Sequence, residues 1–152
     1  MPTVFGKLNL KDHDEIVVVN SPTSFEPELA SLDGVTIRRR VSDIKAIDFS
    51  LAFVTKQKEV DVLAKSIAKK AQGDAIVWFA YPKKSSTRYT CEFNRDTGWA
   101  SLGEAGFEPV RMVAIDDDWS AVRFRRVGFI KTMTRDRHAT LSKEGKQRTR
   151  NT

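Results

Sequence analysis

The sequence predicts an α/β fold in layers around a mainly parallel sheet, and two observations support this. Three runs, residues 16–19, 49–54 and 75–81, carry apolar side chains on both faces of an extended chain. Strands of this kind lie in the middle of parallel sheets, buried on both sides. An amphipathic helical pattern separates the second run from the third, as expected for a crossover between parallel strands.

The first half of the chain supplies two strands and a short helix after an N-terminal arm, residues 1–15. The strand at residues 16–19 ends at a turn that contains Pro22. Residues 26–32 suit a short helix with Pro27 in its first turn. A more polar strand follows at residues 35–41. Its three consecutive arginines place it near the edge of the sheet.

The middle of the chain contains the clearest helix. We expect Thr55, at the end of the third strand, to cap it. Its apolar positions fall on one stripe, and Gly73 is expected to end it. The stripe consists of Val60, Leu63, Ala64, Ile67, Ala68 and Ala71. The fourth strand, residues 75–81, then leads into a polar loop, residues 82–87.

The last third predicts a helix and a hairpin. Asn94 is expected to cap a helix that turns Trp99 and Leu102 inward and ends at Gly106. A strand at residues 110–115, an aspartate turn and an alternating strand at residues 119–126 complete the sheet. This closing hairpin resembles the end of a class I methyltransferase sheet, whose last strand is antiparallel. The whole order predicts a Rossmann-like three-layer sandwich with helices on both faces.

Charge divides the 152 residues into a nearly neutral domain, residues 1–130, and a basic tail, residues 131–152. The tail has seven basic and two acidic residues and no apolar periodicity, so we expect it to be mobile. One interpretation is a solubilising terminus; the other is binding to nucleic acid through phosphate contacts. The candidate contacts are Arg135, Arg137, Lys143, Lys146, Arg148 and Arg150.

Several classes of protein are disfavoured. Cys91 is the only cysteine, so one chain forms no disulfide and no cysteine-based zinc site. No apolar run approaches the roughly 20 residues of a membrane helix, and no signal peptide is apparent, so a cytoplasmic protein is expected. The motifs of P-loop enzymes, serine hydrolases and zinc proteases are missing. His13 is expected in a solvated turn, and we predict no metal.

Cofactor chemistry is disfavoured by the turn after the first strand. Sheets that bind dinucleotides or S-adenosylmethionine have glycines there, because the backbone must approach the ligand closely. This turn has no glycine, and Pro22 removes a backbone donor. No acidic residue ends the second strand, where Asp43 is the nearest candidate for ribose hydroxyls. We therefore predict no cofactor, and the sequence favours a non-catalytic role over an enzyme that binds a small anion or nucleotide.

The remaining candidate site is the edge of the sheet where parallel strands end, since open α/β sheets bind ligands there. Its residues are Asn20, Thr55, Lys83, Lys84, Ser85, Asp116, Asp118, Trp119 and Arg123. They suit a small anion or a nucleotide. Alternatively, Lys83, Lys84 or Arg123 contacts Asp116 or Asp118 and relieves the repulsion within the aspartate turn. Trp119 is then a packing residue.

Three stretches in this order resemble a bacterial family, domain of unknown function 3052. They are Val77-Trp78-Phe79-Ala80-Tyr81-Pro82-Lys83-Lys84, Gly106-Phe107, and Ile115-Asp116-Asp117-Asp118-Trp119-Ser120-Ala121-Val122-Arg123-Phe124. The similarity covers about residues 8–126. It implies a small cytoplasmic α/β protein without an established activity. The resulting hypothesis is a non-catalytic, methyltransferase-like scaffold with a binding or interaction role; the anion site and the nucleic-acid tail are its alternatives.

Overall fold

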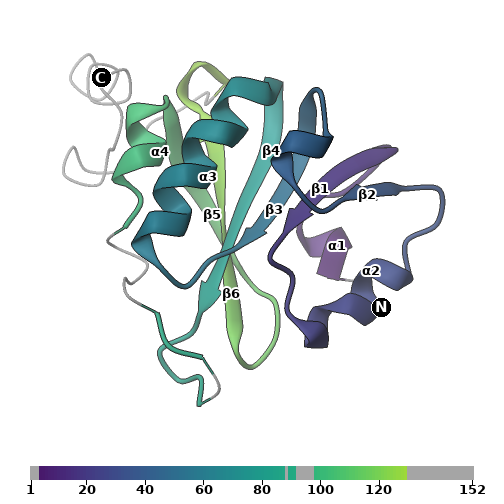
Figure 1. The fold of residues 1–152 in the computed structure, drawn as a ribbon, viewed down its shortest axis with the longest axis vertical. Coiled ribbons are helices and arrows are strands. Elements are labelled where there is room, and N and C mark those ends of the chain that lie inside the picture. Colours follow the sequence, from purple (N-terminus) through teal and green to yellow (C-terminus); the bar gives the residue numbers. More distant parts are fainter. Residues whose placement is uncertain (1–3, 88, 92–97, 130–152) are drawn as a thin grey trace.

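The fold is a single six-stranded sheet with helices on both faces (Figure 1), seen in a computed structural model that describes residues 4–87, 89–91 and 98–129. The strands are β1 (Glu15–Val19), β2 (Thr36–Arg38), β3 (Ile47–Phe53), β4 (Ala71–Pro82), β5 (Phe107–Ala114) and β6 (Trp119–Arg126). The helices are α1 (Val4–Lys7), α2 (Glu26–Ala30), α3 (Gln57–Lys70) and α4 (Ala100–Glu104). Short 3₁₀ turns occupy Thr23–Phe25, Val41–Asp43 and Val127–Phe129.

The strand order is β2-β1-β3-β4-β6-β5. Strands β1 to β4 are parallel, and β6 runs antiparallel between β4 and β5. This confirms the expected mainly parallel sheet with a C-terminal antiparallel hairpin. The three apolar runs form β1, β3 and β4 in the interior of the sheet, and the arginine-rich β2 lies at its edge.

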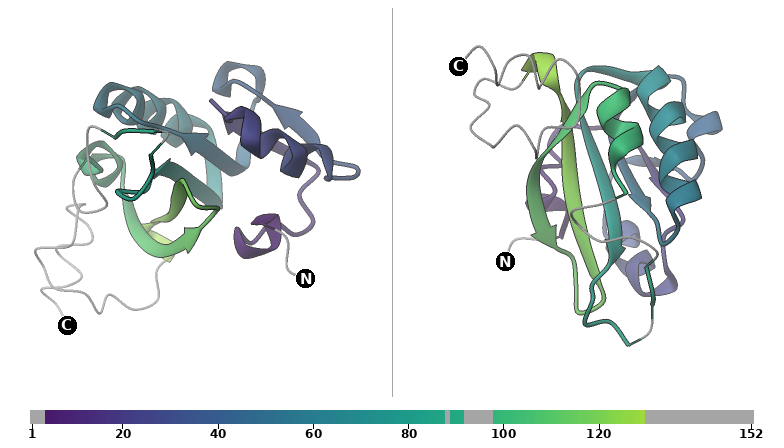
Figure 2. Two further views of the ribbon diagram at one scale, coloured as in Figure 1. Left: turned by 90° about the horizontal axis from the view of Figure 1, so that it is seen from below. Right: turned by 90° about the vertical axis from the view of Figure 1, so that its left-hand side faces the viewer.

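Helices α3 and α4 cover one face of the sheet, as Figure 2 shows. The apolar stripe of α3 packs through Val60, Ala64 and Ile67, and α4 adds Leu102. Trp99, just before α4, packs edge-on against Phe79 of β4 at 5.9 Å between ring centres. The amphipathic pattern therefore correctly identified which side of α3 is buried.

The opposite face is covered by α1 and by the segment that contains α2. Phe5 lies in α1 and Leu8 directly follows it, and Phe25 and Leu29 come from the segment with α2; all four are buried. The N-terminal segment is thus part of the core, although its sequence indicated only an arm. Four helical residues are too few to produce an amphipathic period, so sequence analysis missed α1.

Local details differ from expectation at the ends of elements. The helix α3 ends at Lys70, and Gly73, with φ of 51°, lies inside β4 rather than ending the helix. The N-cap of α3 is Lys56 instead of Thr55. The expected cap Asn94 lies outside the described residues. Residues 130–152 do too, so the division into a domain of residues 1–130 and a tail stays a prediction.

Candidate functional site

The residues expected at the carboxyl ends of the strands do gather at one edge of the sheet. Asn20 follows β1, Thr55 follows β3 and Lys83 follows β4. The turn between β5 and β6 reaches the same edge, because Trp119 pairs with Pro82. In Figure 1 this turn and the loop after β4 lie together at the lower end of the sheet.

The strand order reverses between β1 and β3, since the chain leaves β1 for β2 and returns on the other side to β3. Open α/β sheets bind ligands at such a switch point. Here Asn20 adopts a left-handed backbone with φ of 57°, and its side-chain amide contacts the Glu59 carboxylate at 3.4 Å. Asn20 is exposed, so the switch point faces solvent.

Glu59 occupies the N-terminus of α3. Its Oε1 accepts hydrogen bonds from the backbone N–H groups of Thr55 at 2.9 Å and Lys56 at 3.0 Å. The Thr55 hydroxyl donates to the same oxygen at 3.3 Å. These donors would otherwise attract an anion. Sequence reasoning missed Glu59, although a glutamate three residues after an N-cap is a known helix-start signal.

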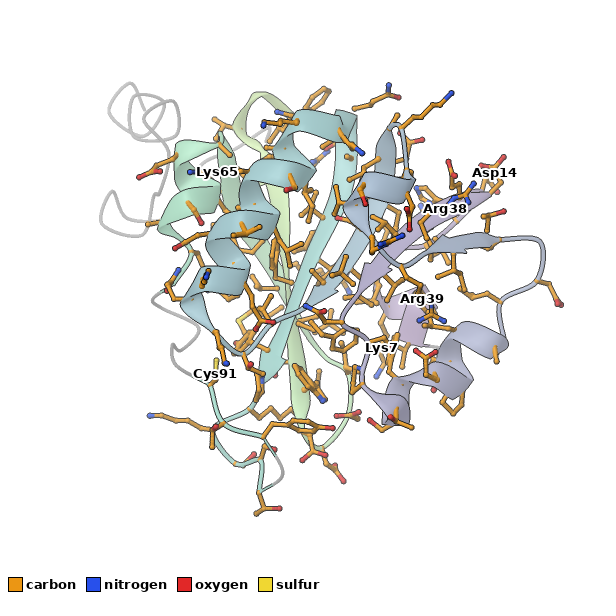
Figure 3. The ribbon with its side chains drawn as sticks, viewed as in Figure 1. Lys7, Asp14, Arg38, Arg39, Lys65 and Cys91 are labelled. Atoms are coloured by element: carbon orange, nitrogen blue, oxygen red, sulfur yellow. The ribbon has the colours of Figure 1, made fainter. Side chains whose placement is uncertain are left out.

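A second carboxylate lies where the loop after β1 enters α2. Glu26, the first residue of α2, receives two parallel hydrogen bonds from the guanidinium of Arg39, both at 2.9 Å. These bonds, and a smaller contribution from the Ser21 hydroxyl, hold the pKa of Glu26 below its ordinary value. Figure 3 shows Arg39 beside α2. An internal ion pair therefore stands where a glycine-rich loop would approach a cofactor.

The end of β2 carries arginines that pair with nearby carboxylates. Arg38 contacts Glu15 at 2.8 Å, and Arg40 contacts Asp43 at 3.2 Å. Asp43, the nearest candidate for ribose hydroxyls, is thereby engaged with a cation.

The aspartate turn is stabilised by neutral donors. Asp116 accepts the backbone N–H groups of Asp118 at 2.8 Å and Trp119 at 2.9 Å. The Ser86 hydroxyl donates to Asp118 at 3.0 Å. The Lys83 backbone N–H donates to the Asp118 carbonyl at 2.8 Å.

The expected ion pair at this turn is not formed. Within the described residues, no side-chain cation of Lys83, Lys84 or Arg123 lies within ion-pair distance of Asp116 or Asp118. The turn needs no cation because its own backbone N–H groups and one serine satisfy the carboxylates. Lys84 and Ser85 are exposed and Lys83 is half-buried.

Arg123 does not belong to this edge. It pairs in register with Trp78, well inside β4, and with Arg111 of β5. It lies four residues along β6 from Trp119, about 13 Å at the usual rise of a strand. Its grouping with the other candidates was wrong, because an extended strand carries successive residues away from the edge.

Trp119 is a packing residue, as its alternative interpretation held. It is buried, with its ring 5.1 Å from that of Phe53 and 4.9 Å from that of Tyr89. Its indole Nε1 is buried and has no hydrogen-bond partner in the described part of the chain.

Similarity to solved structures places this arrangement in a known fold. The chain superimposes on a SAM dependent methyltransferase from Aquifex aeolicus with a TM-score of 0.58 and 15% identity, covering 82% of this chain and 88% of that one. A possible exported protein from Bordetella parapertussis superimposes with a TM-score of 0.54 and 12% identity, covering 81% of this chain and 65% of that one. PigF with SAH superimposes with a TM-score of 0.53 and 10% identity, covering 84% of this chain and 62% of that one. This chain has a Rossmann-like methyltransferase fold.

The similarity concerns the methyltransferase fold alone. Identities this low carry no information on activity, and the chain spans less than two thirds of the Bordetella protein and of PigF. No family model matches the chain, and the curated proteins contain no match. The resemblance to domain of unknown function 3052 therefore rests on its three motifs only.

The described part of the sheet and its loops shows no cluster of side chains of the kind that holds a metal. Among the described residues, no three His, Cys, Asp or Glu side chains are grouped closely enough. His13 accepts the Lys11 backbone N–H at 3.2 Å and packs against Phe49 at 5.5 Å between ring centres.

No helix in the described ranges is long and apolar enough to cross a bilayer. The six tail residues proposed to contact nucleic acid lie outside these ranges.

Proposed function

We propose that this chain is a non-catalytic, methyltransferase-fold protein with a binding or interaction role. The observation that carries the proposal is the Glu59 carboxylate at the switch point, where it accepts the Thr55 and Lys56 N–H groups. A cofactor with an acidic group would have to displace this carboxylate, and the two negative charges would repel each other. The site is thus satisfied from within the chain.

The loop after β1 supports the same proposal. A backbone that approaches a cofactor closely needs glycine, whereas this loop has Asn20, Ser21 and Pro22. The helix that follows, α2, has only five residues, so its dipole is weak, and Pro27 in its first turn removes one N–H donor. Beside this loop, the exposed Arg39 and Glu26 side chains already satisfy each other.

Calorimetry and thermal unfolding with S-adenosylmethionine and its demethylated product test this proposal. A ligand at about 100 times its Kd would stabilise the folded chain by about 2.7 kcal/mol. For a chain of this size, that raises Tm by about 5–10 °C. We expect no binding heat and no shift in Tm with either compound. Micromolar binding of either compound would overturn the proposal.

A small-anion module at the end of β4 is the second candidate. Lys83 and Lys84 follow the strand and form no ion pair with a described carboxylate, so both cations are available to a ligand. The Ser86 hydroxyl is already used within the chain, because it donates to Asp118 and accepts the Tyr89 N–H at 3.1 Å. A thermal-shift screen with phosphorylated metabolites tests this candidate. Stabilisation that disappears in K83Q/K84Q would support it, and no stabilising compound would exclude it.

A further inference from the structure

Three arginines lie together on one face of β5 and β6, away from the strand ends that form the candidate site. Arg123 of β6 stands directly across from Arg111 of β5. Arg125 is two residues further along β6 and therefore points to the same face. Asp74, near the start of β4, is bound to Arg125 through two contacts of 2.6 and 2.8 Å.

The three arginines outnumber the two carboxylates beside them, Asp74 and the buried Glu108, which pairs in register with Arg125. Both oxygens of Asp74 are taken by Arg125, and the described residues provide no carboxylate partner for Arg111 or Arg123. Like charges directly opposite each other on neighbouring strands destabilise a sheet. Burial and then the charge of Arg125 lower the pKa of Arg123; Asp74 opposes this shift, and Arg111 adds to it.

Arg123 also has an unused donor. Its Nε is buried and has no hydrogen-bond partner among the described residues. Buried polar groups normally find partners, so an isolated guanidinium donor beside two further cations suggests that an anion completes the group. Arg111 is exposed, which leaves the group accessible from solvent.

Phosphate is the anion that this arrangement suits best. The planar guanidinium presents parallel N–H groups that match two phosphate oxygens. Arg125 already gives such a pair to Asp74, so Arg111 and Arg123 supply the donors for phosphate, with the Arg125–Asp74 pair beside them. The chain also continues after β6 into residues 131–152, whose sequence has a net charge of +5. By its sequence, this basic segment also attracts a polyanion.

We propose that Arg111, Arg123 and Arg125 form a surface that binds the phosphate backbone of a nucleic acid. This surface does not depend on the proposed function, because it lies on β5 and β6, away from Glu59 at the switch point between β1 and β3. It also differs from binding through the tail alone, since it assigns part of the affinity to strands β5 and β6.

Fluorescence anisotropy of the full-length chain tests the proposal, with labelled single-stranded and duplex DNA and RNA of mixed sequence. The salt concentration is varied from about 50 to about 200 mM. We expect R111Q to weaken binding several-fold and to make the dependence of log affinity on log salt less steep by about one. Arg111 is the residue to change because it is exposed, and a thermal melt verifies that the variant is folded.

The matched control is K65Q, which removes one exposed cation from α3, on the other face of the sheet. It should retain clearly tighter binding than R111Q. Equal losses in the two variants would mean that only net charge matters, and would overturn the assignment. Unchanged binding in both R111Q and R111Q/R125Q would show that other residues supply all of the affinity, and would overturn the proposal. A wild-type chain that binds inorganic phosphate and no nucleic acid would also overturn it.

Discussion

The indole N–H of Trp78, in the middle of β4, donates a hydrogen bond of 2.8 Å to the backbone carbonyl of Leu8, and both residues are fully buried. This bond joins the N-terminal segment to a central strand 70 residues away. It stops α1 from separating from the sheet, since separation would leave a buried donor without a partner.

Leu8 should therefore be important for stability. We expect L8A to lower the free energy of unfolding by about 2–5 kcal/mol, because it leaves a cavity between α1 and the sheet. Urea denaturation measures this loss. K7A changes an exposed neighbour in α1 and should stay within about 0.5 kcal/mol of wild type. A loss below about 1 kcal/mol in L8A would show that the N-terminal segment is not part of the cooperative core.

The Glu59 carboxylate should contribute to stability as a helix cap. We expect E59A to cost about 0.5–2 kcal/mol, because the Thr55 and Lys56 N–H groups lose their acceptor. Chemical denaturation gives the value, with K65A on the exposed side of α3 as the control. If E59A is as stable as wild type, water replaces the carboxylate without cost, and the internal satisfaction of the switch point is refuted.

Glu26 should make stability depend on pH. Its folded pKa is depressed by Arg39, so the pair stabilises the fold above the unfolded value of about 4.3 and stops doing so as the pH falls through the lower folded value. The denaturation midpoint of wild type should thus fall more steeply than that of E26Q over this acidic range. E104Q removes an exposed carboxylate as a control. Identical slopes for E26Q and wild type would contradict the prediction.

The three aspartates of the β5–β6 turn should differ in importance. Asp116 accepts two backbone N–H groups, so D116A should cost about 1–3 kcal/mol. In D118N the amide oxygen still accepts from Ser86, so the cost should stay below about 1 kcal/mol. D117N, at an exposed position, should change stability by less than about 0.5 kcal/mol. A different order, measured by urea denaturation, would show that charge repulsion dominates this turn.

Much of the fold was predictable because it depends on local patterns. The apolar runs became β1, β3 and β4, and the stripe of α3 faces the sheet as its period of 3.6 requires. The alternation after Trp119 correctly indicated an antiparallel final strand. In contrast, the N-terminal segment with α1 was not predictable. It contributes to the core through Phe5 and Leu8, which contact strands far away in the sequence.

The candidate site was predictable in position but not in partners. Strand ends placed Asn20, Thr55, Lys83 and the aspartate turn at one edge, because the edge follows from strand direction alone. Opposite charges at the turn suggested an ion pair, but backbone N–H groups and Ser86 satisfy the carboxylates instead. Arg123 was misplaced, since its position along β6 depends on register.

The sequence by itself determined the burial of β1, β3 and β4, the absence of a glycine-rich turn and the concentration of charge in residues 131–152. These are properties of single segments, whose hydrophobic period and backbone freedom act locally. Only the tertiary structure decided that Glu59 contacts Asn20 at the switch point, that the Trp78 indole donates to the Leu8 carbonyl and that Arg111 lies across from Arg123. Each of these pairs joins elements whose relative position is set by the packing and register of the whole sheet, and no local pattern encodes it.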